Sequence, residues 1–375
     1  MAILTGTSTS WPRALQLSPK KGICPMKEVM LVNRLKIPHY RVAVYNRLSE
    51  YLENYEFHLT VVAEGIEQRG EQPIRFRFIG LSLRIAKLAK LIVSMKPDII
   101  ILWVNHELQF YPILLLAKVM KVRLIHWGHR RNLQRNHDLL NNIVYSFEHW
   151  LDDAIILYGE HLRKYVSKRF QPKTFVANNT LNMTIYKSVR APRKDVKERY
   201  QIYTNRNIIC LGRLQRRKRI NDLILALRQL DDDDVGLILA GPDSEGVLAN
   251  IKDRKIFKVG AIYGEDSLDL LSAADVCCIP GAIGLSIVDA FYCGLPVVTE
   301  KVNHGPEIMY LKDGVNGFLV PPGDIDQLAA KLRLLLSDDI MRERFSRAAK
   351  NEVMTNGHID RMAEGFRDAL QYVCR

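Results

Sequence analysis

Short apolar runs alternate with longer amphipathic stretches along this chain. In the first half, six runs of four to six residues are typical of buried parallel strands: Val29–Val32, Leu59–Ala63, Ile99–Trp103, Val122–Trp127, Ala154–Tyr158 and Thr174–Ala177. Patterns with helical spacing lie between them: Val42–Leu52, Leu83–Met95, Leu108–Met120, Leu139–Leu151 and His161–Phe170. This order predicts a doubly wound α/β domain.

A second alternation of the same kind begins near residue 208. Its expected strands are Ile208–Leu211, Val235–Ala240, Ile256–Val259, Ala274–Ile279, Leu295–Thr299 and Phe318–Val320, with helices between most of them. The chain ends in a helical pattern, His358–Val373. The polar segment Ser188–Tyr200 contains a proline and no strand signal, which is typical of an interdomain connection.

These patterns together predict two Rossmann-like domains, residues 28–190 and 191–355, followed by a C-terminal helical segment, residues 356–375. In open α/β sheets, ligands usually bind beyond the carboxyl ends of the strands, and in two-domain proteins often in the cleft between the domains. We therefore expect functional residues in the loops that follow the strands.

Composition places the chain among soluble globular proteins. The apolar fraction is 47%, and no apolar run approaches the ~20 residues that a membrane-spanning helix needs. Residues 1–27 lack the apolar segment of a signal peptide, so we expect a flexible tail, with Met26 as an alternative start to Met1. None of the six cysteines forms a C-x-x-C pair. This pattern indicates buried thiols in a reducing cytoplasm and argues against a zinc site.

The positive charge is concentrated in the first half of the chain. Residues 1–190 contain 28 Lys and Arg against 14 Asp and Glu, whereas the remainder is close to neutral. A strongly basic half indicates a negatively charged partner. The candidates are an anionic bilayer surface, a phosphorylated acceptor or nucleic acid.

The turn after the expected strand Ala274–Ile279 is a candidate anion site. It runs from Pro280 to Gly284, and a helix then opens with Leu285-Ser286 and carries Asp289 about one turn later. Unpaired backbone N–H groups and the helix dipole favour an anion at such a place, and an acid near it can hold a sugar hydroxyl. An ordinary strand–turn–helix unit of a parallel sheet explains the same pattern equally well.

A basic loop follows the strand Ile208–Leu211. It contains Gly212 and five cations, namely Arg213, Arg216, Arg217, Lys218 and Arg219. Because the loop lies at the carboxyl end of a strand, Arg213 and Lys218 could reach into a cleft and clamp a phosphate. For the other three arginines we favour a solvated loop, which is the usual place of a charge run.

These motifs, in this order, resemble those of retaining glycosyltransferases of family 4, which have the GT-B fold. The resemblance includes the spacing Gly212-Arg213-Leu214-x3-Lys218 and the segment from Gly284 to Val298. It continues through His304-Gly305-Pro306-Glu307 and the segment Asp313–Asp324, so that it covers most of residues 205–330. The amino-terminal half resembles the family more loosely.

The resemblance implies that Arg213 and Lys218 hold the donor diphosphate and take part in catalysis. It implies that the other donor-side residues are Gly212, Gly281, Gly284, Leu285, Ser286, Asp289 and Glu307, with the backbone of residues 284–286 supporting the diphosphate and Asp289 binding the ribose. The family usually has two glutamates here, at the positions of Gly281 and Asp289. Because the carboxylate is missing at Gly281, the identity of the donor sugar cannot be inferred from better-known members of the family. Glu307 could be a residue of the site or could simply pair with a neighbouring cation, and the sequence does not decide between the two.

The amino-terminal half supplies candidates for the reacting centre and for the acceptor. The family often has a histidine just after the strand that ends near residue 126; His129 is favoured over His126, which could be a core histidine. Imidazole suits this place because it can donate a hydrogen bond and change charge near neutral pH. The acceptor candidates, each of which could equally cap its helix or end its strand, are Pro38, Tyr40, Arg41, His106 and His126.

Basic stripes on two expected helices could contact a membrane. Arg84, Lys87 and Lys90 are spaced by three residues, and the segment His161–Phe170 adds four more cations. Such stripes can lie on anionic lipid, although a solvated outer face is the commoner explanation.

We interpret the sequence as a GT-B glycosyltransferase that moves a sugar from a nucleotide diphosphate donor to the hydroxyl of a glycan or lipid-linked acceptor. By the resemblance, the reaction retains the anomeric configuration and needs neither a metal nor another cofactor. The resemblance also implies that the last helix, His358–Val373, returns to pack on the first domain. We expect a cytoplasmic enzyme of polysaccharide biosynthesis, and the basic first half is consistent with a peripheral position on the inner face of the membrane. The alternative is a non-catalytic protein that binds a nucleotide-sugar or nucleic acid, although no nucleic-acid motif is present.

Overall fold

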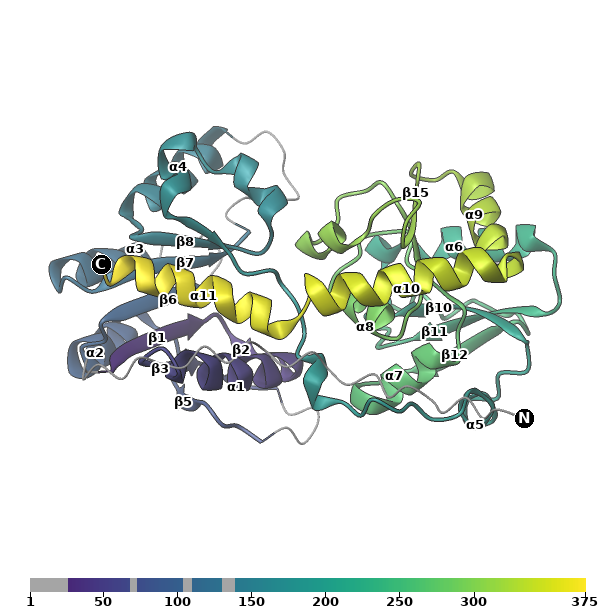
Figure 1. The fold of residues 1–375 in the computed structure, drawn as a ribbon, viewed down its shortest axis with the longest axis horizontal. Helices are drawn as coiled ribbons and strands as arrows, with labels where there is room; N and C mark the ends of the chain where they lie inside the picture. Colours follow the sequence, from purple (N-terminus) through teal and green to yellow (C-terminus); the bar gives the residue numbers. More distant parts are fainter. Residues whose placement is uncertain (1–25, 68–72, 104–109, 130–138) are drawn as a thin grey trace, which may run out of the picture.

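The protein consists of two α/β domains that lie side by side (Figure 1). The computed structural model describes residues 26–67, 73–103, 110–129 and 139–375, without the side chains of residues 139–143. Residues 1–25 of the expected tail therefore lie outside the described residues. Within the described part, no helix is both long and apolar enough to cross a membrane.

The first domain is built on a seven-stranded parallel sheet in the order β5-β3-β1-β6-β7-β8-β9. Its strands are β1 (Lys27–Asn33), β3 (Phe57–Ala63), β5 (Arg77–Gly80), β6 (Ile99–Trp103), β7 (Arg123–Gly128), β8 (Ala154–Leu157) and β9 (Thr174–Val176). The two short strands β2 (Lys36–Ile37) and β4 (Gly65–Ile66) pair separately. The helices that cover the sheet are α1 (His39–Glu53), α2 (Ile85–Met95), α3 (Tyr111–Val119) and α4 (Leu139–Leu151).

The second domain has a six-stranded parallel sheet in the order β12-β11-β10-β13-β14-β15. Its strands are β10 (Arg206–Leu211), β11 (Val235–Ala240), β12 (Ile256–Gly260), β13 (Val276–Cys278), β14 (Val297–Glu300) and β15 (Gly317–Val320). The α-helices of this half are α5 (Arg193–Arg199), α6 (Ile220–Leu230), α7 (Gly264–Ser272), α8 (Ser286–Tyr292), α9 (Ile325–Ser337) and α10 (Asp339–Thr355).

Both sheets reverse their strand order beside their first strand, between β1 and β6 and between β10 and β13. Loops that follow such neighbouring strands leave the sheet toward opposite faces, so a crevice opens between them at the carboxyl edge. The prediction of two doubly wound α/β domains is confirmed, and each domain has its switch point where the sequence places functional loops.

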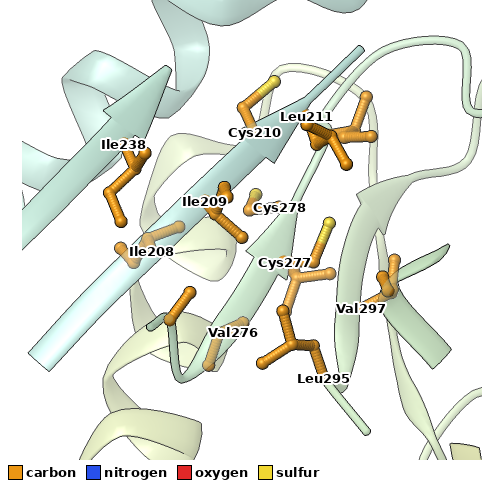
Figure 2. Packing of buried hydrophobic residues seen from close by; sticks show 14 of the residues in the cluster. Ile208, Ile209, Cys210, Leu211, Ile238, Val276, Cys277, Cys278, Leu295 and Val297 are labelled. Carbon is orange, nitrogen blue, oxygen red and sulfur yellow. The ribbon is translucent and has the colours of Figure 1, made fainter. Parts of the chain in front are cut away.

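The core of the second domain forms around β10 and β13, where aliphatic side chains pack with three cysteines (Figure 2). Burial raises the pKa of Cys210 to about 11, which keeps this thiol protonated and unreactive. Cys277 and Cys278 are also fully buried and free. Cys293, at the end of α8, is only partly buried. Cys374, which lies outside the expected strands and helices, is exposed.

One predicted helix is wrong, and one strand of the seven-stranded sheet was missed, as were the two short strands β2 and β4. Residues 161–170 form parts of two 3-10 helices, Glu160–Tyr165 and Lys168–Lys173, separated by the extended residues Val166 and Ser167. The buried residues Leu162, Val166 and Phe170 imitate a helical repeat because they are four positions apart. The missed strand of the seven-stranded sheet is β5, which pairs with β3 alone at the edge of the sheet and has no apolar run.

The C-terminal helix α11 (Ile359–Val373) returns to the first domain (Figure 1). Its apolar face, including Met362 and Phe366, is part of the core of that domain, and Asp360 forms an ion pair with Arg47 of α1 (Nε–Oδ1, 2.7 Å). The chain first leaves this domain before Met183, which packs in the second core, ahead of the expected connection Ser188–Tyr200. That connection contains α5.

The two crossings of the chain between the domains lie next to each other. The side-chain amide of Asn178 donates to the carbonyl of Asn356 (3.0 Å), and the hydroxyl of Thr180 donates to the carbonyl of Gly357. The two segments that connect the domains are therefore joined by hydrogen bonds.

Gly365 should be required for the docking of α11. A Cβ atom at this position would lie 2.0 Å from the carbonyl oxygen of Val176 in β9. We expect Gly365→Ala to lower the melting temperature by roughly 5 °C, because the strain outweighs the better helix propensity of alanine. The matched control is Gln371→Ala on the exposed face of the same helix. Equal melting temperatures of the two variants would contradict the close contact.

Candidate functional site

The basic loop after β10 and the turn after β13 form one hydrogen-bonded unit. The backbone N–H of Gly281 donates to the carbonyl of Lys218 (2.9 Å), and that of Ala282 donates to the carbonyl of Arg217 (3.0 Å). The loop leaves its strand at Gly212, whose φ of 114° favours glycine. The sequence places these two segments more than 60 residues apart, and the switch point of the sheet brings them together.

Gly281 is the residue that allows this close approach. A Cβ atom here would lie 2.0 Å from the carbonyl oxygen of Arg217 and 2.7 Å from the Cα atom of Lys218. Both neighbours are backbone atoms, which cannot move away without breaking the hydrogen bonds of the loop. Any side chain, including the glutamate that family 4 usually has, is therefore excluded in this conformation.

Lys218 is the buried cation of the loop, with 6% of its surface exposed. Its ammonium group donates to the carbonyl of Ala282 in the facing turn (2.6 Å). Burial lowers the pKa of Lys218 to about 8, so the side chain is still mostly charged at neutral pH. An ammonium group has three N–H donors, and an incoming phosphate can use those that remain.

The four arginines of the loop differ in their surroundings. Arg213, Arg216 and Arg217 are exposed. Arg219 is not simply solvated, as its place in a charge run suggests, because it forms ion pairs with Asp222 and with the buried Glu300 (2.6 and 2.9 Å). Arg219 therefore stabilises the base of the loop, while Arg213 is free to meet a ligand.

The helix expected after the turn is α8, which has two turns. Gly284 and Leu285 precede it, and Ser286 begins it opposite Gly212, whose Cβ position lies 3.9 Å from that of Ser286. Asp289 is half-buried in the helix, and burial raises its pKa to about 7. Its negative charge helps to raise the pKa of Tyr186 to about 12, although burial is the larger cause, so this tyrosine lies nearby. No pattern in the sequence indicates Tyr186 as a residue of this site.

Glu307 connects the turn to the first domain. It lies in the short 3-10 helix Pro306–Tyr310, is 4% exposed, and has Oε2 4.0 Å from the Cβ position of Gly284. The side-chain amide of Asn179 donates to its Oε1, and the Oδ1 atom of Asn179 accepts from Nη2 of Arg41 (2.5 Å). Glu307 thus interacts with a cation through an intervening amide. Burial raises the pKa of Glu307.

The two candidate histidines have different environments. His126 is 3% exposed, and its Nδ1 atom contacts Asp152 within the core, so the geometry favours a core histidine rather than an acceptor contact. His129 is half-buried and lies edge-to-face against Tyr158, with 4.8 Å between the ring centroids. Burial and the neighbouring His161 lower the pKa of His129 to about 4, so its imidazole is neutral at physiological pH.

Of the acceptor candidates, Arg41 has the most unusual environment. Pro38 caps α1, Tyr40 lies in the first turn, and Arg41 is 2% exposed beneath them. Its guanidinium lies 5.1 to 5.7 Å from the ring centroids of Tyr40, Trp103 and Trp127. His106 lies outside the described residues.

Asn179 is a residue of this site that was not among the candidates from the sequence. Asn179, which joins Arg41 to Glu307, follows the last strand of the first sheet, and its position after a strand was the available signal. Among the residues that the structure describes, no group of three or more His, Cys, Asp or Glu side chains could hold a metal ion.

Comparison with known proteins supports these assignments of fold and family. Residues 192–352 match the family of glycosyl transferases group 1. The sulfoquinovosyl transferase SQD2 of Arabidopsis thaliana is 29% identical over 149 residues, which are 39% of this chain and 29% of that protein. A glycogen synthase of Mycobacterium tuberculosis is 24% identical over 285 residues, 70% of this chain and 66% of that protein. The chain thus spans less than two thirds of the length of either relative.

A solved structure extends the comparison to both domains. The Anabaena protein Alr3699/HepE in complex with UDP-glucose aligns with a TM-score of 0.70 and 18% identity, over 92% of this chain and 99% of that one. At this identity the match establishes the fold and not the activity. The chain therefore has the GT-B fold, and its residues 192–352 match the group 1 glycosyl transferases.

Proposed function

We propose that this protein is a retaining glycosyltransferase that transfers a sugar from a nucleoside diphosphate donor to an acceptor hydroxyl, without a metal ion. The observation that carries the proposal is the joined basic loop and turn, with Lys218 buried between them, in the domain that matches the family. The complexes of HepE with UDP and with UDP-glucose support a donor of this class.

In the proposed mechanism, Arg213 and Lys218 stabilise the leaving diphosphate. Negative charge grows on the phosphate oxygens as the bond to the sugar breaks, and the buried Lys218 and the exposed Arg213 would stabilise this charge more than they stabilise the ground state. The backbone N–H groups at residues 284–286 and the dipole of α8 would add to this effect. These groups would supply the electrostatic stabilisation that a divalent metal supplies in other enzymes.

The remaining candidates have roles in binding and orientation. Asp289 would form hydrogen bonds with the ribose hydroxyls, and its ionised form would accept them through both carboxylate oxygens. The neutral imidazole of His129 can donate a hydrogen bond to the sugar near its reacting carbon. The acceptor would lie against the first domain, and closure of the domains would exclude water and so limit hydrolysis.

The acceptor in this proposal is a glycan or a lipid-linked saccharide, which would place the enzyme in polysaccharide or glycolipid synthesis. A cytoplasmic protein that associates with an anionic membrane surface is consistent with the basic first domain. Arg84, Lys87 and Lys90 of the α2 region are exposed, and Val119 at the end of α3 is 81% exposed. The basic segment 161–170 supports this proposal less, because Arg163 is bonded to Glu160 and to backbone carbonyls.

Removal of either clamp residue should abolish most of the activity. We expect Arg213→Ala and Lys218→Ala each to lower kcat by about 10²- to 10³-fold, because each would remove stabilisation of the leaving group. Release of the nucleoside diphosphate in the presence of acceptor measures the reaction, and EDTA should leave the wild-type rate unchanged. The matched control is Arg216→Ala, an exposed cation of the same loop. Near-normal turnover of both clamp variants would refute the mechanism, and loss of activity in EDTA would refute metal independence.

Lys218 should give donor binding a pH dependence. Its pKa of about 8 means that the charged form dominates below pH 8 and is lost above it. We expect the affinity for a nucleoside diphosphate to fall as the pH rises from 8 to 10, by up to about tenfold per pH unit. In Lys218→Arg the side chain stays charged throughout this range, so the fall should disappear. Isothermal titration calorimetry between pH 7 and pH 10 measures both proteins, and identical profiles would contradict the role of Lys218.

Gly281 should be needed for the shape of the donor site. Gly281→Ala would place a Cβ atom against the backbone of residues 217 and 218. We expect it to lower the melting temperature by several degrees and nucleoside diphosphate affinity by about tenfold, because the loop must move. At Gly284 a Cβ atom has room, with its nearest neighbour 4.0 Å away, so Gly284→Ala should not lower the melting temperature. If Gly281→Ala were as stable as Gly284→Ala, the steric argument would fail.

A further inference from the structure

Four residues at the carboxyl edge of the first sheet contain buried polar nitrogen atoms that have no hydrogen-bond partner. They are Arg41 (Nε and Nη1), Trp127 (Nε1), His129 (Nδ1) and His161 (Nδ1). Buried donors and acceptors in folded proteins are nearly always paired, so several unpaired atoms in one place require an explanation. Nothing in the described parts of the chain supplies the missing partners.

Ring contacts connect Arg41, Trp127 and His129 by way of Tyr158, and His161 acts on His129 through its charge. The guanidinium of Arg41 lies 5.1 Å from the ring centroid of Trp127, and that ring is 5.5 Å from the ring of Tyr158. The ring of His129 packs edge-to-face against Tyr158 at 4.8 Å. His161 lies in the 3-10 helix that follows β8, and its charge acts on His129. We call Arg41, Trp127, His129 and His161 the nitrogen cluster.

The charge of the cluster is not balanced by a direct ion pair. Within the described residues, no carboxylate forms a salt bridge with Arg41, and Glu307 is reached only through Asn179. The surrounding aromatic faces attract the guanidinium, but they do not accept its N–H groups as an oxygen atom does. A buried cation of this kind is more stable with an anion beside it.

The cluster is not sealed on every side. Arg41 is 2% exposed, whereas Tyr40, Trp103, His129 and His161 around it are only half-buried. The cluster belongs to the first domain, where the proposed function places the acceptor. It is joined by Asn179 and Glu307 to the turn at Gly284, where that function places the donor.

We propose that the nitrogen cluster binds an anionic group of the acceptor substrate, and that Arg41 supplies the positive charge. The group is a carboxylate or a phosphate, because both present several oxygen acceptors to N–H donors. The inference rests on the proposed function, since it assigns the acceptor to the first domain. It predicts that the enzyme selects acidic or phosphorylated acceptors over neutral ones.

A set of three matched probes tests this proposal. Methyl glucoside, methyl glucuronoside and methyl glucoside 6-phosphate share one sugar ring and differ only at C6. This carbon carries a hydroxyl group in the first, is the carboxylate carbon in the second and carries a phosphate in the third. Each is titrated by calorimetry into the full-length protein after saturation with the nucleoside diphosphate that raises the melting temperature most. The nucleotide occupies the phosphate site of the second domain, so that the probes report on the first.

We expect at least one anionic probe to bind wild-type protein about tenfold more tightly than methyl glucoside, and the tighter of the two identifies the source of the charge. Arg41→Met should remove this preference and leave the nucleotide affinity within about twofold of wild type. The control Lys36→Met removes an exposed cation just before the same helix and should keep the preference. His161→Gln should weaken the anionic probe about threefold, and it carries the test if Arg41→Met does not fold.

Three results would overturn the proposal. Wild-type protein could bind the three probes equally, or Arg41→Met could keep the preference for the anionic probe. Arg41→Met could instead lose the nucleotide, which would assign Arg41 to the donor. If no nucleoside diphosphate binds wild-type protein, the proposed function fails, and the same probes titrated without nucleotide still decide whether the cluster binds an anion.

Discussion

The contact between two backbone segments at Gly281 is the constraint on which the proposed donor site depends. Two hydrogen bonds join the turn after β13 to the basic loop after β10, and both need a residue without a side chain at this position. The contact buries Lys218 against the turn and lowers its pKa. The position of the clamp and its charge are thus determined by a backbone approach and not by an acidic partner.

The protein contains two buried cations that are held in different ways. Lys218 of the second domain is bonded to a backbone carbonyl, and its pKa falls far enough that its charge depends on the pH of the solution. Arg41 of the first domain is surrounded by aromatic rings and one amide, and an arginine stays charged at any physiological pH. Asn179 and Glu307 connect Arg41 to the turn beside Lys218. The connected residues therefore span the two domains at the place where a donor and an acceptor would meet.

Much of the fold could be predicted from the sequence, because strands buried on both faces are continuous apolar runs, as in β6 and β11. The edge strand β5 lacks such a run, and the 3-10 segment near residue 165 has helical spacing without helical backbone. The candidate loops could be found from their place after strands. The place of Asn179 after a strand was a signal, but its contact with Glu307 could not be predicted, because Glu307 is distant in sequence. Tyr186 could not be found, because the nearby Asp289 is also distant in sequence. The absence of the family's glutamate at Gly281 could be seen in the sequence. Its steric cause could not, because Gly281 contacts the backbone of residues that lie more than 60 positions earlier.

The return of α11 to the first domain has a consequence for the synthesis of the protein. Met362, Phe366 and Leu370 of this helix complete the core of a domain whose other strands and helices come from the first half of the chain. During translation, the first domain therefore lacks part of its core until the residues of α11 have left the ribosome. The second domain has all its buried residues earlier, since its cluster extends only from Met183 to Val353. The domain that is translated first is thus the last one whose core can be completed, and its exposed apolar surface must be tolerated or protected until then.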